Sequence, residues 1–327
     1  MTFTSPFDIT LSDSFSFPFH SDQYRYSNNS VALDPSHVVT ITKDYKEEIQ
    51  LKRKLLDNSP NRCFQSFPST IEAQWEIFEL IMLELVERFP QYFTLENHFP
   101  NSTFTNHLLN EQQTFVFGKT DTLPYEPLDF IGRHIQEDLI YLSQRDGDLF
   151  MDAGQLCFPA NWSLAFNIGM TYLEFHSPVP VFSSSGLAEK VRNFLLRMEL
   201  GKPWARLNWT LTVGPHLHTF PENYDDWGKQ KAQLTDQNIG ELVHLRVEHQ
   251  KLFRLGESNG ILFSLHTYLK SFEQLIQNDV YKKRLLSVMS DIPQYMAEYK
   301  GFYSYQELLV QYLTAANEGR NHNASKI

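Results

Sequence analysis

Two apolar segments joined by a glycine-containing turn place the strongest constraint on the fold of this chain. Residues 242–255 (LVHLRVEHQKLFRL) and 261–269 (ILFSLHTYL) flank the turn sequence GESNG, and this arrangement predicts a long antiparallel hairpin. The first segment also fits a helical period, so a helix stays open as the alternative there. Upstream, residues 206–213 (RLNWTLTV) alternate between polar and apolar side chains and predict a further strand. The apolar side chains that share one face of it are Leu207, Trp209, Leu211 and Val213.

Helical periodicity dominates the sequence on both sides of these strands. Ser69 and Glu72 have the spacing of a capping box, which predicts a helix start before a wide apolar stripe. Residues 91–126 show little periodicity and are expected to form a long loop with short strands. QRDGD at 144–148 predicts a turn. Helices are expected at 42–57, 70–88, 127–144, 185–200 and, with interruptions, over 270–318, and further strands at 149–158 and 168–176.

The expected fold class is therefore α+β, an antiparallel sheet with flanking N-terminal and C-terminal helices. Three regions are expected within one integrated domain. Residues 1–148 form an N-terminal arm and helical region, residues 149–270 a core, and residues 271–327 the C-terminal helices and tail.

Charge and composition exclude several classes of function. The formal net charge is −11, and an acidic chain repels phosphate backbones, so nucleic acid is not an expected partner. Two cysteines do not make a disulfide framework. The sequence has neither a secretory leader at its start nor an apolar run long enough to cross a bilayer, so we expect a cytoplasmic protein with no membrane partner.

One histidine, His176, lies in an apolar and aromatic segment just before Ser-Pro-x-Pro. A stiff, extended chain would hold this imidazole as a ligand for a metal or haem iron. The alternative is a buried histidine with a hydrogen-bond partner. Cys157 is the rival iron ligand, although no cation flanks it to lower the pKa of its thiol, and a small buried side chain is the simpler role.

A second candidate metal site is the sequence HLH at 216–218 followed by Glu222. His216 and His218 would share one face of a strand, and Glu222 could complete a triad of ligands. The spacing resembles the first half of a cupin motif, but the glycine expected before it is not at the right distance and no second half follows. A polar loop is the alternative interpretation.

Arginine, asparagine and tryptophan side chains supply the remaining candidates for a ligand pocket. The planar guanidinium groups of Arg206, Arg246 and Arg254 suit a carboxylate ligand, although ion pairing within the chain is equally expected. Glu248 lies two residues after Arg246, and hence on the same strand face. Two Asn-Trp pairs, each able to line a pocket or to belong to the core, are Asn161–Trp162 and Asn208–Trp209.

Taken in order, six sequence motifs resemble the haem-dependent oxidative N-demethylase family, a former family of unknown function. The resemblance covers residues 24 to 275 approximately. The motifs are QEDL at 136–139, LCFPANW at 156–162, FHSPVP at 175–180, RLNW at 206–209, LRVEHQKLFRL at 245–255 and ILFSLHTYL at 261–269.

The resemblance implies a PAS-like domain, expected over residues 149–270, that binds haem b and uses dioxygen. The family's activity is the demethylation of a small secondary amine, dimethylamine, with electrons from NADPH through separate FMN- and 2Fe-2S-containing reductase subunits. Position by position, it makes His176 the axial ligand of the haem iron and offers Arg206, Asn208, Trp209 and Arg246 to the cofactor pocket. We add Trp162 to that pocket, and Glu248 and Asn161 as catalytic candidates. Glu248 would either bind an ammonium substrate or hold Arg246.

The chain departs from the family's pattern at three positions, and residues 24–34 (YRYSNNSVALD) lack the Met-Gly step expected of relatives. The family usually has an arginine where His249 stands, a proline at Gly256, and a basic residue at His266. These departures bear on the substrate and on haem retention rather than on the fold. The alternatives to an enzyme are a PAS-type sensor of haem or a small molecule, without turnover, and a non-haem metal protein using His216, His218 and Glu222.

Overall fold

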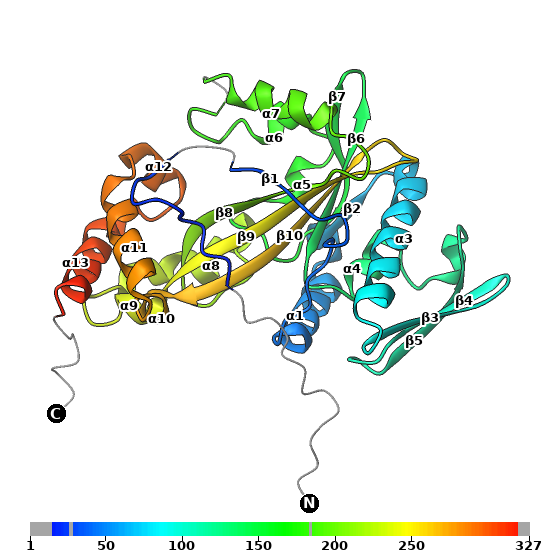
Figure 1. Ribbon diagram of the computed structural model, residues 1–327, viewed down its shortest axis with the longest axis horizontal. Helices are drawn as coiled ribbons and strands as arrows, with labels where there is room; N and C mark the ends of the chain where they lie inside the picture. The colour runs from blue at the N-terminus through cyan, green and yellow to red at the C-terminus, as the bar shows by residue number, and fades with distance from the viewer. Residues whose placement is uncertain (1–14, 26–28, 183–184, 320–327) are drawn as a thin grey trace, which may run out of the picture.

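The structure is a computed structural model that describes residues 15–25, 29–182 and 185–319. The tail beyond residue 319 and the start of the N-terminal arm therefore lie outside the described residues. A seven-stranded antiparallel sheet forms the centre of the molecule (Figure 1). In spatial order its strands are β1 (Val31–Ala32), β8 (Trp204–Val213), β9 (Val243–Arg254), β10 (Ile261–Ser271), β6 (Asp138–Arg145), β7 (Asp148–Gln155) and β2 (Phe64–Ser66).

The long hairpin and the strand before it are confirmed. β9 pairs with β10 from His244 opposite Ser271 to Arg254 opposite Ile261, and β8 pairs with β9 along its whole length. The predicted turn between β6 and β7 is also present. Asp146 and Gly147 both have left-handed backbone conformations, with φ of 52° and 75°, as a two-residue Asp-Gly hairpin turn requires.

Helices cover the sheet on both faces. Side chains of β9 and β10 pack against α5 (Leu164–Asn167), α6 (Tyr172–Phe175) and α7 (Leu187–Leu196) on the face that we call the α7 face. Its shared core includes Leu252, Ile261, Leu265, Leu164, Tyr172 and Leu195.

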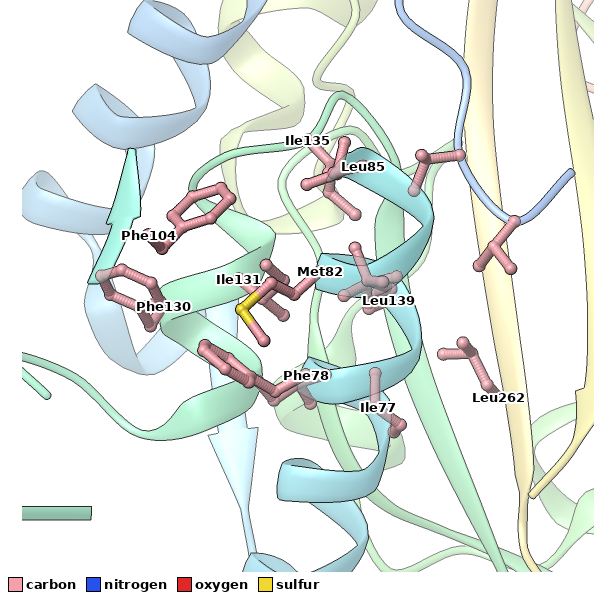
Figure 2. Close-up of a cluster of buried hydrophobic side chains, with 14 of the residues drawn as sticks. Ile77, Phe78, Met82, Leu85, Phe104, Phe130, Ile131, Ile135, Leu139 and Leu262 are labelled. Carbon is pink, nitrogen blue, oxygen red and sulfur yellow. The ribbon is translucent and has the colours of Figure 1, made fainter. Parts of the chain in front are cut away.

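The opposite face, called here the α3 face, is covered from two directions. At one end, α1 (Tyr45–Asn58) and α3 (Ile71–Arg88) pack on β6 and β10. Figure 2 shows Phe78 and Met82 of α3 beside Ile131 of α4 (Pro127–Gly132), while Ile77 approaches Leu262 of β10. At the other end, α11 (Asp279–Asp291), α12 (Gln294–Tyr299) and α13 (Gln306–Asn317) pack on the apolar side chains of β8 and β9 (Figure 1).

The segment expected to be a loop with short strands is a regular three-stranded sheet beside α3 and α4 (Figure 1). Its strands are β3 (Phe93–His98), β4 (Asn101–Asn106) and β5 (Glu111–Val116). The remaining helices are α2 (Pro60–Cys63), α8 (Tyr224–Trp227), α9 (Ile239–Leu242) and α10 (Phe272–Leu275), with short 3-10 turns between elements.

The helix predicted over 127–144 is wrong beyond its first two turns. α4 ends at Gly132, and β6 begins at Asp138. Leu139, Ile140, Tyr141 and Leu142 are all buried, because β6 lies inside the sheet and both of its faces are covered. A continuous apolar run of this kind fits a helix and an internal strand equally well. The boundary expected at residue 148 falls within this β6–β7 hairpin, so the sheet takes strands from both sides of it.

The strand predicted over 168–176 is also wrong, and with it the extended backbone expected at His176. The segment folds into α6, which Thr171 opens with a capping box to Glu174. His176 is the C-terminal cap of that helix and has helical backbone angles, with φ of −96° and ψ of −1°. The capping box predicted for Ser69 and Glu72 is absent, because a 3-10 turn precedes α3 and Thr70 bonds to the Phe67 carbonyl instead.

Two expected absences can be checked against the described residues. Both cysteines are free thiols. Within the residues that the structure describes, no helix combines the length and the apolarity needed to cross a lipid bilayer.

The packing of α3 gives a stability prediction. Met82→Ala should lower the free energy of unfolding by about 2–5 kcal/mol, because it leaves a cavity between α3, α4 and the sheet. Urea-induced unfolding would measure this loss. Glu79→Ala, at an exposed position of the same helix, is the matched control and should change stability by less than about 0.5 kcal/mol. Equal losses in the two variants would contradict the packing described for α3.

Candidate functional site

A row of polar side chains crosses the α7 face of β8 and β9. Asn208 lies opposite Glu248, and Thr210 lies opposite Arg246. The Glu248 carboxylate is 4% exposed and accepts hydrogen bonds from Asn208 Nδ2 at 3.2 Å and Gln250 Nε2 at 2.9 Å. Arg246 Nε lies 3.5 Å from Glu248 Oε1. Own-chain donors therefore surround this carboxylate, and the ion pair expected between Arg246 and Glu248 is present.

The Arg246 guanidinium is fully buried and ties three segments together. It donates to the carbonyl of Leu217 at 2.6 Å, to the carbonyl of Phe158 and to Thr267 Oγ1 at 3.2 Å. Burial lowers the pKa of Arg246, and Glu248 opposes that effect. Arg246 thereby holds the loops after β7 and β8 against the sheet.

Asp138 holds the same loop from the other side, and sequence reasoning did not single it out. Its carboxylate accepts the backbone N–H groups of Cys157 at 2.8 Å and Phe158 at 2.7 Å. Lys52 Nζ lies 3.7 Å from it. The signal was its place in the QEDL motif, because Asp138 begins β6 directly beside the LCFPANW loop.

His176 lies at the end of α6 within an aromatic cage. Its ring centroid is 4.3 Å from that of Tyr172, 4.6 Å from Phe175 and 5.3 Å from Phe182. Nδ1 lies 2.9 Å from the Tyr172 carbonyl oxygen, which can only accept, so Nδ1 carries the proton. Burial lowers the pKa of His176 to about 4, and the Arg206 cation adds to that effect. The ring is therefore neutral near pH 7, with the lone pair on Nε2.

Two cations stand beside this row. Arg206 on β8 acts electrostatically on both His176 and Lys300. Lys300 follows α12; its Nζ donates to the Trp209 carbonyl at 2.6 Å and lies 4.3 Å from the centroid of the Trp209 ring. Burial and then Arg206 lower the pKa of Lys300 to about 7, against the opposing charge of Glu248. No motif pointed to Lys300, because it lies beyond the segments that carry the resemblance.

A pocket of about 380 Å³ opens where β1 stops pairing with β8. The N-terminal arm, the chain entering β1, and β8 and β9 all contribute to its walls. The lining residues are Ser16, Pro18, His20, Asn29, Ser30, Val31, Ala205, Arg206, Leu207 and His249.

The other predicted site residues lie apart from the polar row. Asn161 is exposed in a turn with a left-handed φ of 58°, and its N–H donates to the Thr219 carbonyl. Trp162 is half-buried against the core of the α7 face. Trp209 lies on the α3 face, with its ring centroid 4.9 Å from that of Phe19. Arg254 donates to the carbonyls of Leu195, Met198 and Asn259 and to Gln144.

The rival metal and thiolate sites find no support in the geometry. Burial raises the pKa of the Cys157 thiol, so the thiolate that binds iron is disfavoured. His216 Nε2 lies 3.2 Å from Gln230 Oε1, and Glu222 accepts a hydrogen bond from the Ser163 hydroxyl. Among the residues described, no group of three or more His, Cys, Asp or Glu side chains could hold a metal ion.

The buried Arg246–Glu248 pair gives a test by double substitution. Arg246→Met should lower the free energy of unfolding by about 3–5 kcal/mol, because it strips a buried carboxylate of its counter-charge. Arg246→Met/Glu248→Gln should lose less than the single variant, since the uncompensated charge is gone. Lys202→Met, which breaks an exposed pair with Glu199, is the control and should cost about 1 kcal/mol or less. A double variant less stable than Arg246→Met would contradict this account.

Comparison with protein families agrees with the resemblance carried by the motifs. A family model described as "Haem-dependent oxidative N-demethylase, alpha subunit-like" matches residues 30–310. The matched range includes the polar row, the aromatic cage of His176, and Lys300. The chain therefore belongs to the haem-dependent oxidative N-demethylase, alpha subunit-like family.

Proposed function

We propose that this chain binds haem b and, with dioxygen and electrons from a separate reductase, removes a methyl group from a small secondary amine of the dimethylamine kind. The observation that carries the proposal is the state of His176. A metal-bound histidine usually donates its second ring N–H to a carbonyl, which fixes the tautomer and the ring orientation. His176 has this arrangement through the Tyr172 carbonyl, and Nε2 has no hydrogen-bond partner among the described residues.

The order of the central strands supports a PAS-like core. Counted along the chain from β6, strands β7, β6, β10, β9 and β8 follow the order 2-1-5-4-3. Helices α5 to α7 lie between the second and third of these strands. This is the arrangement that characterises PAS domains, in which a ligand lies between the sheet and these helices. In this chain, side chains of the α7 face pack against those of α5 to α7 in this region, and His176 ends α6 beside them.

His176, Trp162 and Arg206 are residues of the types that bind haem groups in proteins. His176 would be the axial ligand, Trp162 an apolar wall, and Arg206 a cation for an acidic substituent. Bound haem would supply the activation of dioxygen. Glu248, Asn208 and Arg246 would act as positioning residues, because their mutual contacts hold β8, β9 and the LCFPANW loop in register.

The other roles follow from the observed contacts. Glu248 accepts two hydrogen bonds from its own chain and forms an ion pair with Arg246, so holding Arg246 suits it better than binding an ammonium substrate. Trp209 would hold the Lys300 ammonium in place, because its ring lies against Nζ and its carbonyl accepts a hydrogen bond from it. Asn161 lies in an exposed turn, and the catalytic role predicted for it stays a prediction.

Reconstitution with hemin tests the cofactor and its ligand. The full chain should give a Soret band at one haem per chain, and His176→Ala should lose most of that absorbance. His216→Ala, at a histidine outside the aromatic cage, should leave the band unchanged. Unaltered haem content and spectrum in His176→Ala would refute the assignment.

Turnover separates the enzyme from the sensor. With a reductase that reduces the bound haem, dimethylamine should accelerate oxygen consumption and release formaldehyde. Stoichiometric haem binding without amine-dependent oxygen consumption would select a non-catalytic sensor instead.

The pH dependence of ligation follows from the lowered pKa of His176. Only the neutral ring donates a lone pair to iron. Because the pKa of His176 is lowered to about 4, the ring takes up a proton only well below the ordinary range of histidine. The spectrum of the ligated haem should stay constant from about pH 8 to about pH 5 and change only at about pH 4 or below, because iron competes with the proton for Nε2. A midpoint near pH 6.5 would contradict the burial described for this ring.

A further inference from the structure

The chain's two cysteines lie together in a small core that the proposed function does not use. Cys63 is the last residue of α2, and Cys157 lies in the loop after β7. Their backbones meet where β2 pairs with β7, because the Leu156 N–H donates to the Cys63 carbonyl at 2.7 Å. Both cysteine side chains are fully buried, in a core shared with Phe158 and Phe220. The fold therefore brings together two thiols that are far apart in the sequence.

Both sulfur atoms contact the same stretch of α1. Cys63 Sγ lies 3.6 Å from the Leu55 carbonyl oxygen, and Cys157 Sγ lies 3.9 Å from the Lys52 carbonyl oxygen. Carbonyl groups three residues apart lie on one side of a helix and are separated by about 4.5 Å along its axis. The two sulfurs are therefore neighbours, and they form a hydrogen bond with each other.

The surroundings make the two thiols chemically unequal. The hydrogen bond with Cys157 and the nearby Arg62 cation lower the pKa of Cys63, against its burial and the charge of Asp138. Burial raises the pKa of Cys157, and the hydrogen bond with Cys63 adds to that effect. The S–H of Cys157 therefore donates to the sulfur of Cys63. Because the thiolate is the nucleophilic form, Cys63 is the reactive member of the pair and Cys157 keeps its proton.

Arg62 is held beside this pair, close to the surface. Its guanidinium lies 4.5 Å from the centroid of the Phe220 ring, which belongs to the same core. α2 is a single turn, in which Pro60 and Asn61 are exposed and Arg62 is half-buried. A short surface element of this kind opens locally at low free-energy cost. A small oxidant can thus reach Cys63 without unfolding of the sheet.

We propose that Cys63 and Cys157 are a redox-active dithiol, in which hydrogen peroxide oxidises Cys63 and Cys157 then closes a disulfide. In the first step, the Cys63 thiolate attacks one peroxide oxygen and the O–O bond breaks. The hydroxide that leaves takes up the proton that Cys63 had released, and the sulfur becomes a sulfenic acid.

The second step joins the two sulfurs. Cys157 attacks the sulfur of the sulfenic acid, the S–O bond breaks, and the hydroxide that leaves takes the thiol proton to form water. Together the sulfurs lose two electrons, which the peroxide gains.

The disulfide would join α2 to the loop that Asp138 and Arg246 hold from its two sides. Cys157 is the residue whose N–H donates to Asp138, so the new bond would add a covalent tie to a segment that is already anchored. This inference does not depend on the proposed function, since neither cysteine is among the residues assigned to the haem or to the amine.

Oxidation of the full chain with hydrogen peroxide tests the pair, with alkylation of the remaining thiols under denaturing conditions and mass spectrometry of the peptides. The oxidised chain should contain an intramolecular Cys63–Cys157 disulfide that a phosphine reductant reverses. Cys157→Ser should stop at a sulfenic acid on Cys63, which dimedone traps, and Cys63→Ser should leave Cys157 as a thiol.

Arg62→Gln tests the origin of the reactivity. Disulfide formation should slow by about threefold or more, because the thiolate loses its neighbouring cation. Arg197→Gln, at an exposed arginine outside this core, is the matched control and should react at the rate of the unaltered chain. Equal rates in the two variants would contradict the role of Arg62.

Three results would overturn the proposal. The first is a chain in which both thiols still alkylate after glutathione in the same solution has been oxidised. The others are a dimedone adduct on Cys157 in Cys63→Ser, and a disulfide between two chains on a non-reducing gel. Circular dichroism establishes that each variant is folded, and the measurement on the unaltered chain needs no variant.

Discussion

The arrangement around the candidate site depends on the buried charges of Arg246, Glu248 and Asp138. Arg246 reaches the carbonyls of Phe158 and Leu217, and Asp138 accepts the N–H groups of Cys157 and Phe158. The loop after β7 is thus held from both sides, by a cation on its carbonyl and an anion on its N–H groups. Because a buried charge without a partner is costly, these contacts allow one arrangement of loop and sheet.

That constraint connects the sheet to His176. The LCFPANW loop leads into α5, and α6 follows it, so the position of the loop decides where the aromatic cage lies above the α7 face. Within the cage, burial and the Tyr172 carbonyl leave His176 neutral with Nε2 as the lone-pair nitrogen. The family of the chain, its strand order and this histidine all agree with a haem protein, although each rests on a different observation.

The sequence predicted elements whose periodicity or flanking turns favoured one structure. β8 alternates, the turn GESNG separates β9 from β10 although β9 also fits a helical period, and α1 and α3 carry one apolar stripe each. The sequence pattern could not distinguish a helix from an internal strand at Leu139–Leu142, because every side chain there is buried. Arg246 and Asp138 bond largely to backbone groups, which leave no trace in side-chain patterns. Lys300 meets Trp209 through a contact across 91 positions of the chain, which no local motif encodes.

A crystal structure of the hemin-loaded chain tests the central claim most directly. The account predicts that the porphyrin lies between the α7 face and helices α5 to α7, with its iron bonded to Nε2 of His176 and Nδ1 still donating to the Tyr172 carbonyl. Iron bonded to Cys157 or to another histidine, or a porphyrin on the α3 face, would contradict it.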